Sequence, residues 1–512
     1  MNNKINRRDF LACIGASFMA APLMSFADQA NRQTNVLIIT ADDLNWDSLG
    51  VTGCKVPKIT PNVDRLASQG VLFEEAHVMT SICGPSRNAL LSGRYPHCSG
   101  AMGHKTACPP DDWQPPMPHT PDLSTYLHDN GYFTGAINKH SRLIAKTFDV
   151  MYECEPWGMG SDDRDPQVFY ERTKDFIEQS KREAKPFFLY DNIIDPHWPW
   201  PDTQKENELK DEYEALLGSE RINREKYLKY PVPSSDYKPA DIDVPGFLPD
   251  VPELREYLVP YFNSVKRMDD AVGQILKALD DCGQRDNTIV VFLSDNGITI
   301  PGGKWGCYYS STKTPLIVRW PNKVSSGVRY GDSPVSSIDI MPTVIEALGL
   351  EPVKGIEGMS FFDILNEKSN AGKRGYVYTA ANWLADGSDE QYYPMRAVAD
   401  TDYLYIWNSF AISRDDITEN AGGKDPVLDM LMKYKNSNPE YSEKAEIYLN
   451  RPVEELFNVA NDSGCWYNLA SDRIHREKID KARQLLLSEM KRTKDPELKI
   501  YQEYLAKESG RS

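Results

Sequence analysis

A cysteine with unusual neighbours is the first residue that could do chemistry. Cys83 begins the stretch CGPSRNALLSG, in which a proline and an arginine follow closely. Pro85 suits the first position of a helix, so we expect Cys83 to lie just before a helix N-terminus. Free N–H groups and peptide dipoles favour an anion there, and Arg87 in the first turn adds positive charge. The cysteine is therefore a candidate nucleophile, metal ligand, disulfide partner or precursor of another group.

Two pairs of oxygen-bearing side chains follow two apolar stretches. Asp42 and Asp43 come after NVLIIT and one alanine, and Asp295 and Asn296 come after NTIVVFL and one serine. Adjacent carboxylates repel each other unless a cation or strong donors compensate them, although turn residues and helix caps give the same pattern. The repetition at two strand ends favours a metal site. Oxygen ligands alone are the preference of a hard cation such as Ca²⁺ or Mg²⁺ rather than of zinc.

Cys83 does not fit such a site as a plain thiolate, because soft sulfur is a poor match for a hard cation. We therefore expect the reactive atom at this position to become an oxygen. A structural thiol or a disulfide partner is the alternative interpretation of this cysteine.

Four apolar stretches have the pattern of buried parallel strands, namely NVLIIT, YFTGAI, PFFLYDNII and NTIVVFL. Helical patterns such as 60–70 and 253–282 lie between them, and this alternation predicts an α/β domain with a mostly parallel sheet. Such sheets place their sites at the carboxyl ends of strands. We therefore expect one site to gather the polar residues that follow the four stretches: Asp42, Asp43, Asn138, Lys139, His140, Asp195, His197, Asp295 and Asn296.

The rest of the chain indicates a second, smaller domain. A passage with Gly and Lys at 371–375 is the candidate linker. After it, YPMRAVADTDYLYIWN has the pattern of a strand pair, and 474–491 that of an amphipathic helix. We predict a large α/β domain at 28–375 that carries the site. A C-terminal α+β domain with an antiparallel sheet is predicted at 376–512.

The N-terminus resembles an export signal. Residues 1–27 contain Arg7 and Arg8, an apolar stretch and small residues before a cut expected after Ala27. We predict an exported protein, periplasmic or secreted, without a membrane span, because no other apolar stretch is long enough. The formal net charge of −17 argues against nucleic acid and anionic membranes as partners. An anionic substrate would need a local basic pocket.

The stretch from Cys83 to Arg94 resembles the signature of the type I sulfatases, Cys-x-Pro-Ser-Arg-x-x-x-Leu-Thr-Gly-Arg, with Ser92 in place of the threonine. In that family a dedicated maturase oxidises the cysteine to formylglycine (3-oxoalanine), whose hydrate supplies the nucleophile and oxygens for the metal. The resemblance implies an alkaline-phosphatase-like sandwich, with a large mostly parallel sheet flanked by helices and a smaller C-terminal domain. It also implies a divalent cation, usually Ca²⁺, held by Asp42, Asp43, Cys83, Asp295 and Asn296.

The resemblance implies roles for five more residues. Arg87 matches the arginine that orients the hydrated aldehyde, and Lys139 the lysine that contacts sulfate. His197 matches the histidine near the leaving-group oxygen, and Lys304 the basic residue beyond the metal ligands. His140 departs from the pattern, because the family often has Gly-Lys-x-His and this histidine comes one place early. We include it among the catalytic candidates.

Three blocks, SDNGITIPGGK, KRMDDAVGQIL and YYPMRAVADTDYLYIWN, resemble heparan N-sulfatase (sulfamidase), and similar sequences occur among bacterial polysaccharide sulfatases. Arg396 is expected at the pocket mouth, with a structural ion pair as the alternative. Trp198 and Trp200 suit either stacking on sugar rings or the core. We predict a sulfatase that acts on a sulfated carbohydrate. The alternatives are an N-sulfoglucosamine sulfohydrolase specifically, a phosphatase or phosphodiesterase of the same superfamily, and a silent glycan-binding protein.

Overall fold

Strand β1 (Asn35–Ala41) lies inside an eight-stranded sheet in the computed structural model. The described residues are 33–103, 120–139, 148–154, 162–198, 200, 231–367, 373–384, 391–412 and 426–510. The sheet order is β5-β4-β6-β1-β7-β8-β2-β9. The other strands are β5 (Val150–Tyr152), β4 (Phe133–Asn138), β6 (Phe187–Ile193), β7 (Thr288–Ser294), β8 (Leu316–Arg319), β2 (Val71–Phe73) and β9 (Val328–Tyr330).

The strands around β1 are parallel, as the four apolar stretches predict. β1 pairs in parallel with β6 and β7, and β4 pairs in parallel with β5 and β6. β8 alone runs antiparallel to its neighbours, β7 and β2. The parallel register matches Ala41 with Ser294 and Thr40 with Asn192, so the polar residues after β1, β6 and β7 emerge at one edge of the sheet.

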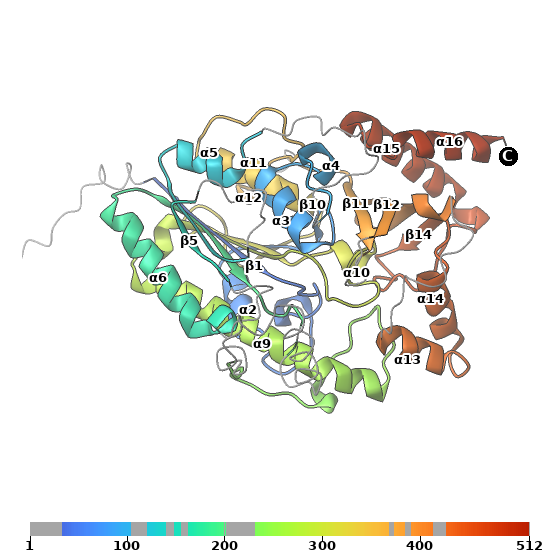
Figure 1. Cartoon of the computed structure of the whole chain (residues 1–512), viewed down its shortest axis with the longest axis horizontal. Helices are drawn as coiled ribbons and strands as arrows, with labels where there is room; N and C mark the ends of the chain where they lie inside the picture. The colour runs from blue at the N-terminus through green and yellow to red at the C-terminus, as the bar shows by residue number, and fades with distance from the viewer. Residues whose placement is uncertain are drawn as a thin grey trace, which may run out of the picture. The chain divides into compact units, whose positions relative to one another are not determined.

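Helices cover both faces of this sheet, which is why β1 is apolar without alternation. Leu37 and Ile39 pack into one core, whereas Val36 and Ile38 pack into the core on the opposite face. Figure 1 shows α6 and α9 along one face and α3, α5 and α11 on the other. The helices of the first face are α2 (Pro61–Ser68), α6 (Pro166–Arg182) and α9 (Pro252–Asp281). Those of the second face are α3 (Cys83–Ser92), α5 (Leu123–Asp129), α11 (Ile340–Ala347) and α12 (Phe362–Leu365).

A separate antiparallel sheet follows in the C-terminal part, in the order β11-β12-β13-β14. Its strands are β11 (Val377–Leu384), β12 (Gln391–Ala399), β13 (Tyr403–Asn408) and β14 (Glu454–Asn458). The accompanying helices are α13 (Pro426–Tyr434), α14 (Pro439–Leu449), α15 (Arg476–Thr493) and α16 (Leu498–Ser509). Trp407 and Tyr501 pack in a third core between this sheet and its helices. The large sheet flanked by helices and the separate antiparallel sheet confirm the predicted fold class.

The predicted division at 375/376 stays a prediction. Residues 34–512 form one compact unit, and Met395 of the antiparallel sheet belongs to the same core as Leu37 of the large sheet. The predicted signal, 1–27, lies outside the described residues. Among the described helices, none combines the length and apolar character needed to cross a membrane.

Short elements complete the structure. They are β3 (Ala76–His77), β10 (Val335–Ser336), α4 (Pro96–Ser99), α10 (Tyr309–Thr312) and the 3₁₀ helices η1 (Gly50–Thr52), η3 (Asp162–Arg164), η4 (Pro239–Asp241), η5 (Arg285–Asn287), η6 (Ser337–Asp339), η7 (Ser409–Ile412) and η8 (Arg473–His475).

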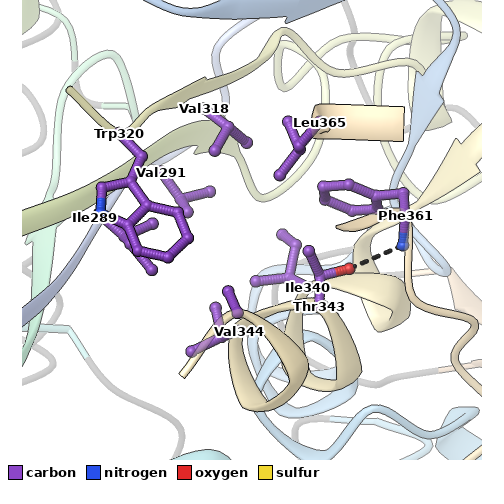
Figure 2. Close-up of a pocket in the computed structure, with 10 residues that line it drawn as sticks. Ile289, Val291, Val318, Trp320, Ile340, Thr343, Val344, Phe361 and Leu365 are labelled. Atoms are coloured by element: carbon purple, nitrogen blue, oxygen red, sulfur yellow. Dashed lines mark hydrogen bonds between the residues drawn. The ribbon is translucent and has the colours of Figure 1, made fainter. Parts of the chain in front are cut away.

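A small apolar cavity lies between the sheet and the helices α11 and α12 (Figure 2). Its volume is about 10 Å³, and side chains of Val291, Val344 and Phe361 line it. Thr343 is the polar residue of its lining, and its hydroxyl is already engaged by the N–H of Phe361 at 3.0 Å and the carbonyl of Asp339 at 2.6 Å. A space of this size with apolar walls is expected to stay dry. It is a packing defect rather than a ligand site.

Candidate active site

The predicted metal ligands meet where β1 and β7 end side by side. Asp42 and Asp43 follow β1, and Asp295 and Asn296 follow β7. The amide of Asn296 donates to Oδ1 of Asp43 at 2.6 Å, and the backbone N–H of Asp43 donates to Oδ1 of Asp295 at 3.2 Å. Asp43 has a left-handed φ of 61°, an unfavourable conformation that is typical of functional sites. All four side chains are buried. The parallel register of β1 and β7 places the residues that follow these strands side by side, which brings the two pairs together.

Three oxygens of this group have no hydrogen-bond partner among the described residues: Oδ1 of Asp42, Oδ1 of Asn296, and Oδ2 of Asp295, which lies in an ion pair with Arg87. A buried oxygen without a partner is unfavourable by about 1–3 kcal/mol. The donor set is rich in carboxylate and amide oxygen, which is what Ca²⁺ or Mg²⁺ requires. One ligand atom each of Asp42, Asp43, Cys83 and His197 also lies within 4.8 Å of the others. The residues therefore fit a hard divalent cation.

Cys83 is the first residue of α3, two positions earlier than the proline predicts. Ile82 is extended, and its carbonyl accepts the N–H of Ser86 at 2.8 Å, which closes the first helical turn. Pro85 thus occupies the first turn, where its missing N–H is not needed. The shift places the cysteine side chain directly at the helix N-terminus.

The thiol of Cys83 is buried, and its pKa is raised above the ordinary value. Its Sγ lies 3.0 Å from Nζ of Lys304, which also lies 2.5 Å from Oδ1 of Asp43. Burial, and then the charge of Asp42, raises the pKa of Cys83 to about 12. At neutral pH this group is a protonated thiol, and the thiolate is the form that acts as nucleophile or metal ligand. Without a bound cation, burial therefore keeps the unmodified side chain in the thiol form.

Arg87 joins the helix α3 to the ends of three strands. Its Nη2 lies 2.8 Å from Oδ2 of Asp295 and 3.3 Å from Oδ2 of Asp42. Its Nη1 donates to Oγ1 of Thr40 at 2.6 Å and to Oδ1 of Asn192 at 2.5 Å. Sequence reasoning missed Thr40 and Asn192. The available signal was a hydroxyl near the end of β1 and an amide near the end of β6, next to Asp191.

Lys139 follows β4, and its Nζ lies 2.7 Å from Oδ2 of Asp42. Burial opposes ionisation of Asp42, yet the charges of Lys139, His197 and Arg87 together hold its pKa well below the ordinary value. The carboxylate is therefore ionised. For Asp295 the balance is reversed, because burial raises its pKa to about 6 despite the charge of Arg87.

His197 follows β6 and approaches the same group. Its Nε2 lies 3.9 Å from Oδ2 of Asp43, and its Nδ1 is hydrogen-bonded to the carbonyl of Trp198. Because a carbonyl can only accept, Nδ1 carries the proton in the neutral ring and Nε2 is the atom that exchanges protons with a ligand. Burial, followed by the charge of Lys139, lowers the pKa of His197 to about 4.

The charges of this site are close to balanced before a cation is added. The carboxylates of Asp42, Asp43 and Asp295 face three basic side chains, those of Arg87, Lys139 and Lys304. A divalent cation would leave an excess of two positive charges, which favours an anionic substrate. With a cation bound, this group would supply the local positive charge that an anionic substrate of an acidic chain requires.

Arg396 does not join this group. It is fully buried on β12, and its Nε lies 2.7 Å from Oδ2 of Asp495. Burial and pairing favour the structural ion pair that the sequence left open, because a side chain with no exposed surface cannot line a pocket mouth. His140 lies outside the described residues, and its role stays a prediction.

The two tryptophans of PHWPWPD differ. Trp200 is a core residue: only 2% of its surface is exposed, and its ring contacts Tyr257 and Tyr261. Trp198 is only partly buried against the same core. Of these two tryptophans, only Trp198 therefore has the exposed surface that stacking on a sugar ring requires.

The sequence profile described as Sulfatase matches residues 34–350, and the one described as N-sulphoglucosamine sulphohydrolase, C-terminal, matches residues 303–417. An ulvan-active sulfatase of Formosa agariphila is 25% identical over 450 residues, which are 84% of this chain and 70% of that protein. The N-sulphoglucosamine sulphohydrolase of Homo sapiens is 26% identical over 475 residues, 91% of either chain. A solved structure described as a complex with its substrate D-glucosamine-2-N,6-O-disulfate has the same fold, with a TM-score of 0.63 at 18% identity, and covers 91% of this chain and 99% of that one.

Proposed function

The chain belongs to the sulfatase family and is a sulfuric ester hydrolase, and we propose that its substrate is a sulfated carbohydrate, either a polysaccharide or its oligosaccharides. Support comes from relatives whose names specify ulvan and N-sulphoglucosamine, and from a neighbour described with a glucosamine disulfate. The excess of positive charge that a bound divalent cation would create suits the anionic sulfate group.

We further propose that Cys83 is converted to formylglycine by a maturase. The observation that carries this proposal is a buried thiol with a raised pKa beside Lys304 and hard oxygen ligands. The hydrated aldehyde would supply one hydroxyl to attack sulfur and a second whose deprotonation expels sulfate. Because only 2% of Cys83 is exposed in the folded chain, conversion is expected before folding is complete.

Asp42, Asp43, Asp295 and Asn296 are proposed to hold Ca²⁺, together with the modified Cys83. The cation would withdraw negative charge from the sulfate oxygens and from the nucleophile. Oδ1 of Asp42 and Oδ1 of Asn296, which have no hydrogen-bond partner among the described residues, support this assignment.

The chain's own residues would perform the remaining tasks. Lys139, Lys304 and Arg87 are placed to stabilise charge that develops on the sulfate oxygens. His197 presents Nε2 toward the same space and would donate a proton to the departing oxygen or nitrogen. The lowered pKa of His197 means that the anionic substrate must help to protonate it, since a nearby negative charge favours the imidazolium form.

N-sulfoglucosamine is a second, more specific candidate substrate. It is favoured by the match of residues 303–417 to the C-terminal profile of N-sulphoglucosamine sulphohydrolase. Sulfate release from N-sulfated glucosamine, 6-O-sulfated glucosamine and ulvan oligosaccharides separates the two proposals. Failure on every sulfated sugar, with turnover of phosphate esters, would contradict both.

Peptide mass spectrometry tests the modification directly. The tryptic peptide 66–87, from protein made in a host with a maturase, is expected to carry formylglycine at position 83. An unmodified cysteine in active protein would overturn the proposal. We also propose export to the periplasm or beyond, directed by residues 1–27, which predicts a mature N-terminus after Ala27.

Cys83→Ala is expected to lower sulfate release by at least about 10³-fold, because the nucleophile is lost. Cys83→Ser is the matched control: its single hydroxyl can be sulfated but cannot expel sulfate, so labelled sulfate should remain on the protein. Thermal unfolding of both variants should stay near that of the parent. Full turnover by either variant would contradict the assigned nucleophile.

A further inference from the structure

Asp195 lies between β6 and His197 and is held by two buried arginines. Arg267, on α9, makes a two-pronged contact: its Nε lies 2.6 Å from Oδ2 of Asp195, and its Nη2 lies 2.9 Å from Oδ1. Arg164, at the end of η3, binds Oδ1 from the other side. The three side chains are at most 1% exposed. They form a cluster, Arg164–Asp195–Arg267, directly behind the turn that carries His197.

Each arginine of the cluster also holds one backbone carbonyl, and the two carbonyls differ. Nη1 of Arg164 donates to the carbonyl of His197 itself at 3.0 Å. Nη1 of Arg267 donates to the carbonyl of Pro231, also at 3.0 Å. The two arginines are therefore matched in burial and charge, and both bind Asp195, Arg267 through two nitrogens and Arg164 through one. The contact of Arg164 with the carbonyl of His197 is the difference on which the comparison depends.

The position of the His197 ring depends on this backbone. The N–H of His197 donates to the carbonyl of Ile194 at 2.9 Å, and its Nδ1 bonds the carbonyl of Trp198. The carbonyl of Asp195 accepts the N–H of Asp42 at 3.4 Å, which connects the same turn to the acidic group. A displacement of the turn would move Nε2 away from the position where it faces Asp43.

We propose that Arg164 is a positioning residue for His197: it holds the turn from 195 to 197 so that Nε2 faces the leaving group. This inference rests on the proposed proton donation by His197. A misplacement of about 1 Å in such a group can lower a rate by about 100-fold. The effect should depend on the leaving group, because a weakly basic phenolate departs without a proton and a strongly basic one does not.

The experiment compares Arg164→Met with Arg267→Met. Each change removes one charge and one carbonyl contact and leaves Asp195 with the other arginine. The probes are phenyl sulfate and 4-nitrophenyl sulfate. Arg164→Met should lower kcat for phenyl sulfate by about 100-fold and for 4-nitrophenyl sulfate by less than about 3-fold. Arg267→Met should change both substrates by one common factor.

Equal losses on the two substrates in Arg164→Met, or the same selectivity in Arg267→Met, would overturn the proposal. Arg164→Lys keeps a charged donor and should recover part of the loss on phenyl sulfate. Thermal unfolding shows whether each variant is folded. If Arg164→Met is not folded, Arg164→Lys takes its place in the comparison.

A spectroscopic measurement separates this proposal from the proposed function. In protein with ¹⁵N-labelled histidine, the ring signals of His197, assigned through His197→Ala, should shift in Arg164→Met and stay in place in Arg267→Met. An unchanged His197 signal in Arg164→Met rejects the positioning role whether or not the enzyme turns over. If His197→Ala loses equal activity on the two sulfates, the proton-donor assignment fails, while the spectrum still decides whether Arg164 holds the ring.

Discussion

Two buried clusters of charge in this protein resemble each other in composition, but their carboxylates differ in the hydrogen bonds that they accept. In the C-terminal part, Oδ2 of Asp495 accepts from Arg396 at 2.7 Å and from Tyr378 at 2.6 Å, and Oδ1 accepts from the N–H of Glu497 at 2.8 Å. At the edge of the large sheet, Oδ2 of Asp42 is bound by basic side chains, but Oδ1 has no hydrogen-bond partner among the described residues.

The comparison teaches that burial and ion pairing do not identify an active site. Both clusters have buried carboxylates and a buried arginine. Arg396, which the sequence offered as a substrate-binding residue, belongs to the Asp495 cluster, where its Nη2 has no hydrogen-bond partner among the described residues. The two carboxylates differ in hydrogen bonding: both oxygens of Asp495 accept hydrogen bonds, whereas Oδ1 of Asp42 has no hydrogen-bond partner among the described residues. The oxygen of Asp42 without a partner fits the cation proposed for that cluster, whereas the protein's own donors occupy both oxygens of Asp495.

The largest expected difference concerns Asp42→Asn. A neutral amide weakens cation binding, so we expect sulfate release to fall by at least about 10³-fold. The proposed Ca²⁺ site would stabilise the parent by about 2.7 kcal/mol when Ca²⁺ is at about 100 times its Kd, and this stabilisation should disappear in the variant. Thermal unfolding with Ca²⁺ and with a chelator measures this. Asp495→Asn is the control, and it should retain the Ca²⁺ effect on a lower unfolding temperature. A Ca²⁺ effect that survives in Asp42→Asn would break the comparison.

Arg396→Met should act on stability alone. Removing one partner of a buried pair leaves Asp495 uncompensated, and the free energy of unfolding should fall by about 3–5 kcal/mol. Denaturant unfolding measures the loss. Activity per folded molecule, and KM for the sulfated substrate, should not change. A raised KM with normal stability would instead return Arg396 to the substrate pocket.

The acid limb of stability should report the Asp495 cluster. Burial alone would raise the pKa of this carboxyl, but Arg396, His97 and Tyr378 lower it to about 2, from 3.8 in the unfolded chain. A depressed pKa in the folded state stabilises above the unfolded pKa and is lost as pH falls through 3.8 toward 2. The contribution is about 2–3 kcal/mol. Unfolding free energies between pH 5 and pH 2 should fall less steeply in Asp495→Asn, and an unchanged slope would contradict the assignment.

The smallest effect is expected at the apolar cavity of Figure 2. Among the described residues, no charged side chain lines this cavity, so it is the uncharged region against which the two clusters are compared. Val344→Ile adds one methylene toward a space of about 10 Å³. Stability should rise by up to about 0.8 kcal/mol if the added group fits without strain. Differential scanning calorimetry measures the shift, and activity should be unchanged. A fall in activity would show that this cavity communicates with the site.

Most of the site could be predicted because it follows strand ends. Asp42, Lys139 and Asp295 each come directly after an apolar stretch, and parallel strands bring such residues to one edge of a sheet. The start of α3 was predicted two residues late, because Pro85 suits any position in the first helical turn. The local sequence therefore predicted the helix and misplaced only its first residue.

The partners of the site were less accessible to prediction. Thr40 and Asn192 lie within strands, where a single polar residue gives no indication of which helix it will face. Arg396 and Asp495 are separated by 99 positions, and nothing local to either residue indicates the other. Such partners are chosen by the packing of distant elements.

The amino-acid sequence alone identified the cysteine signature, the candidate oxygen ligands and the alternation of strands and helices, because each depends on neighbouring residues and on the period of the chain. The tertiary structure decided which buried charges are satisfied and which are not. It placed Arg164 behind His197 and Arg396 against Asp495, and it left one oxygen of Asp42 without a donor. The physical reason is that hydrogen-bond satisfaction is a property of three-dimensional neighbours, which the order of residues does not specify.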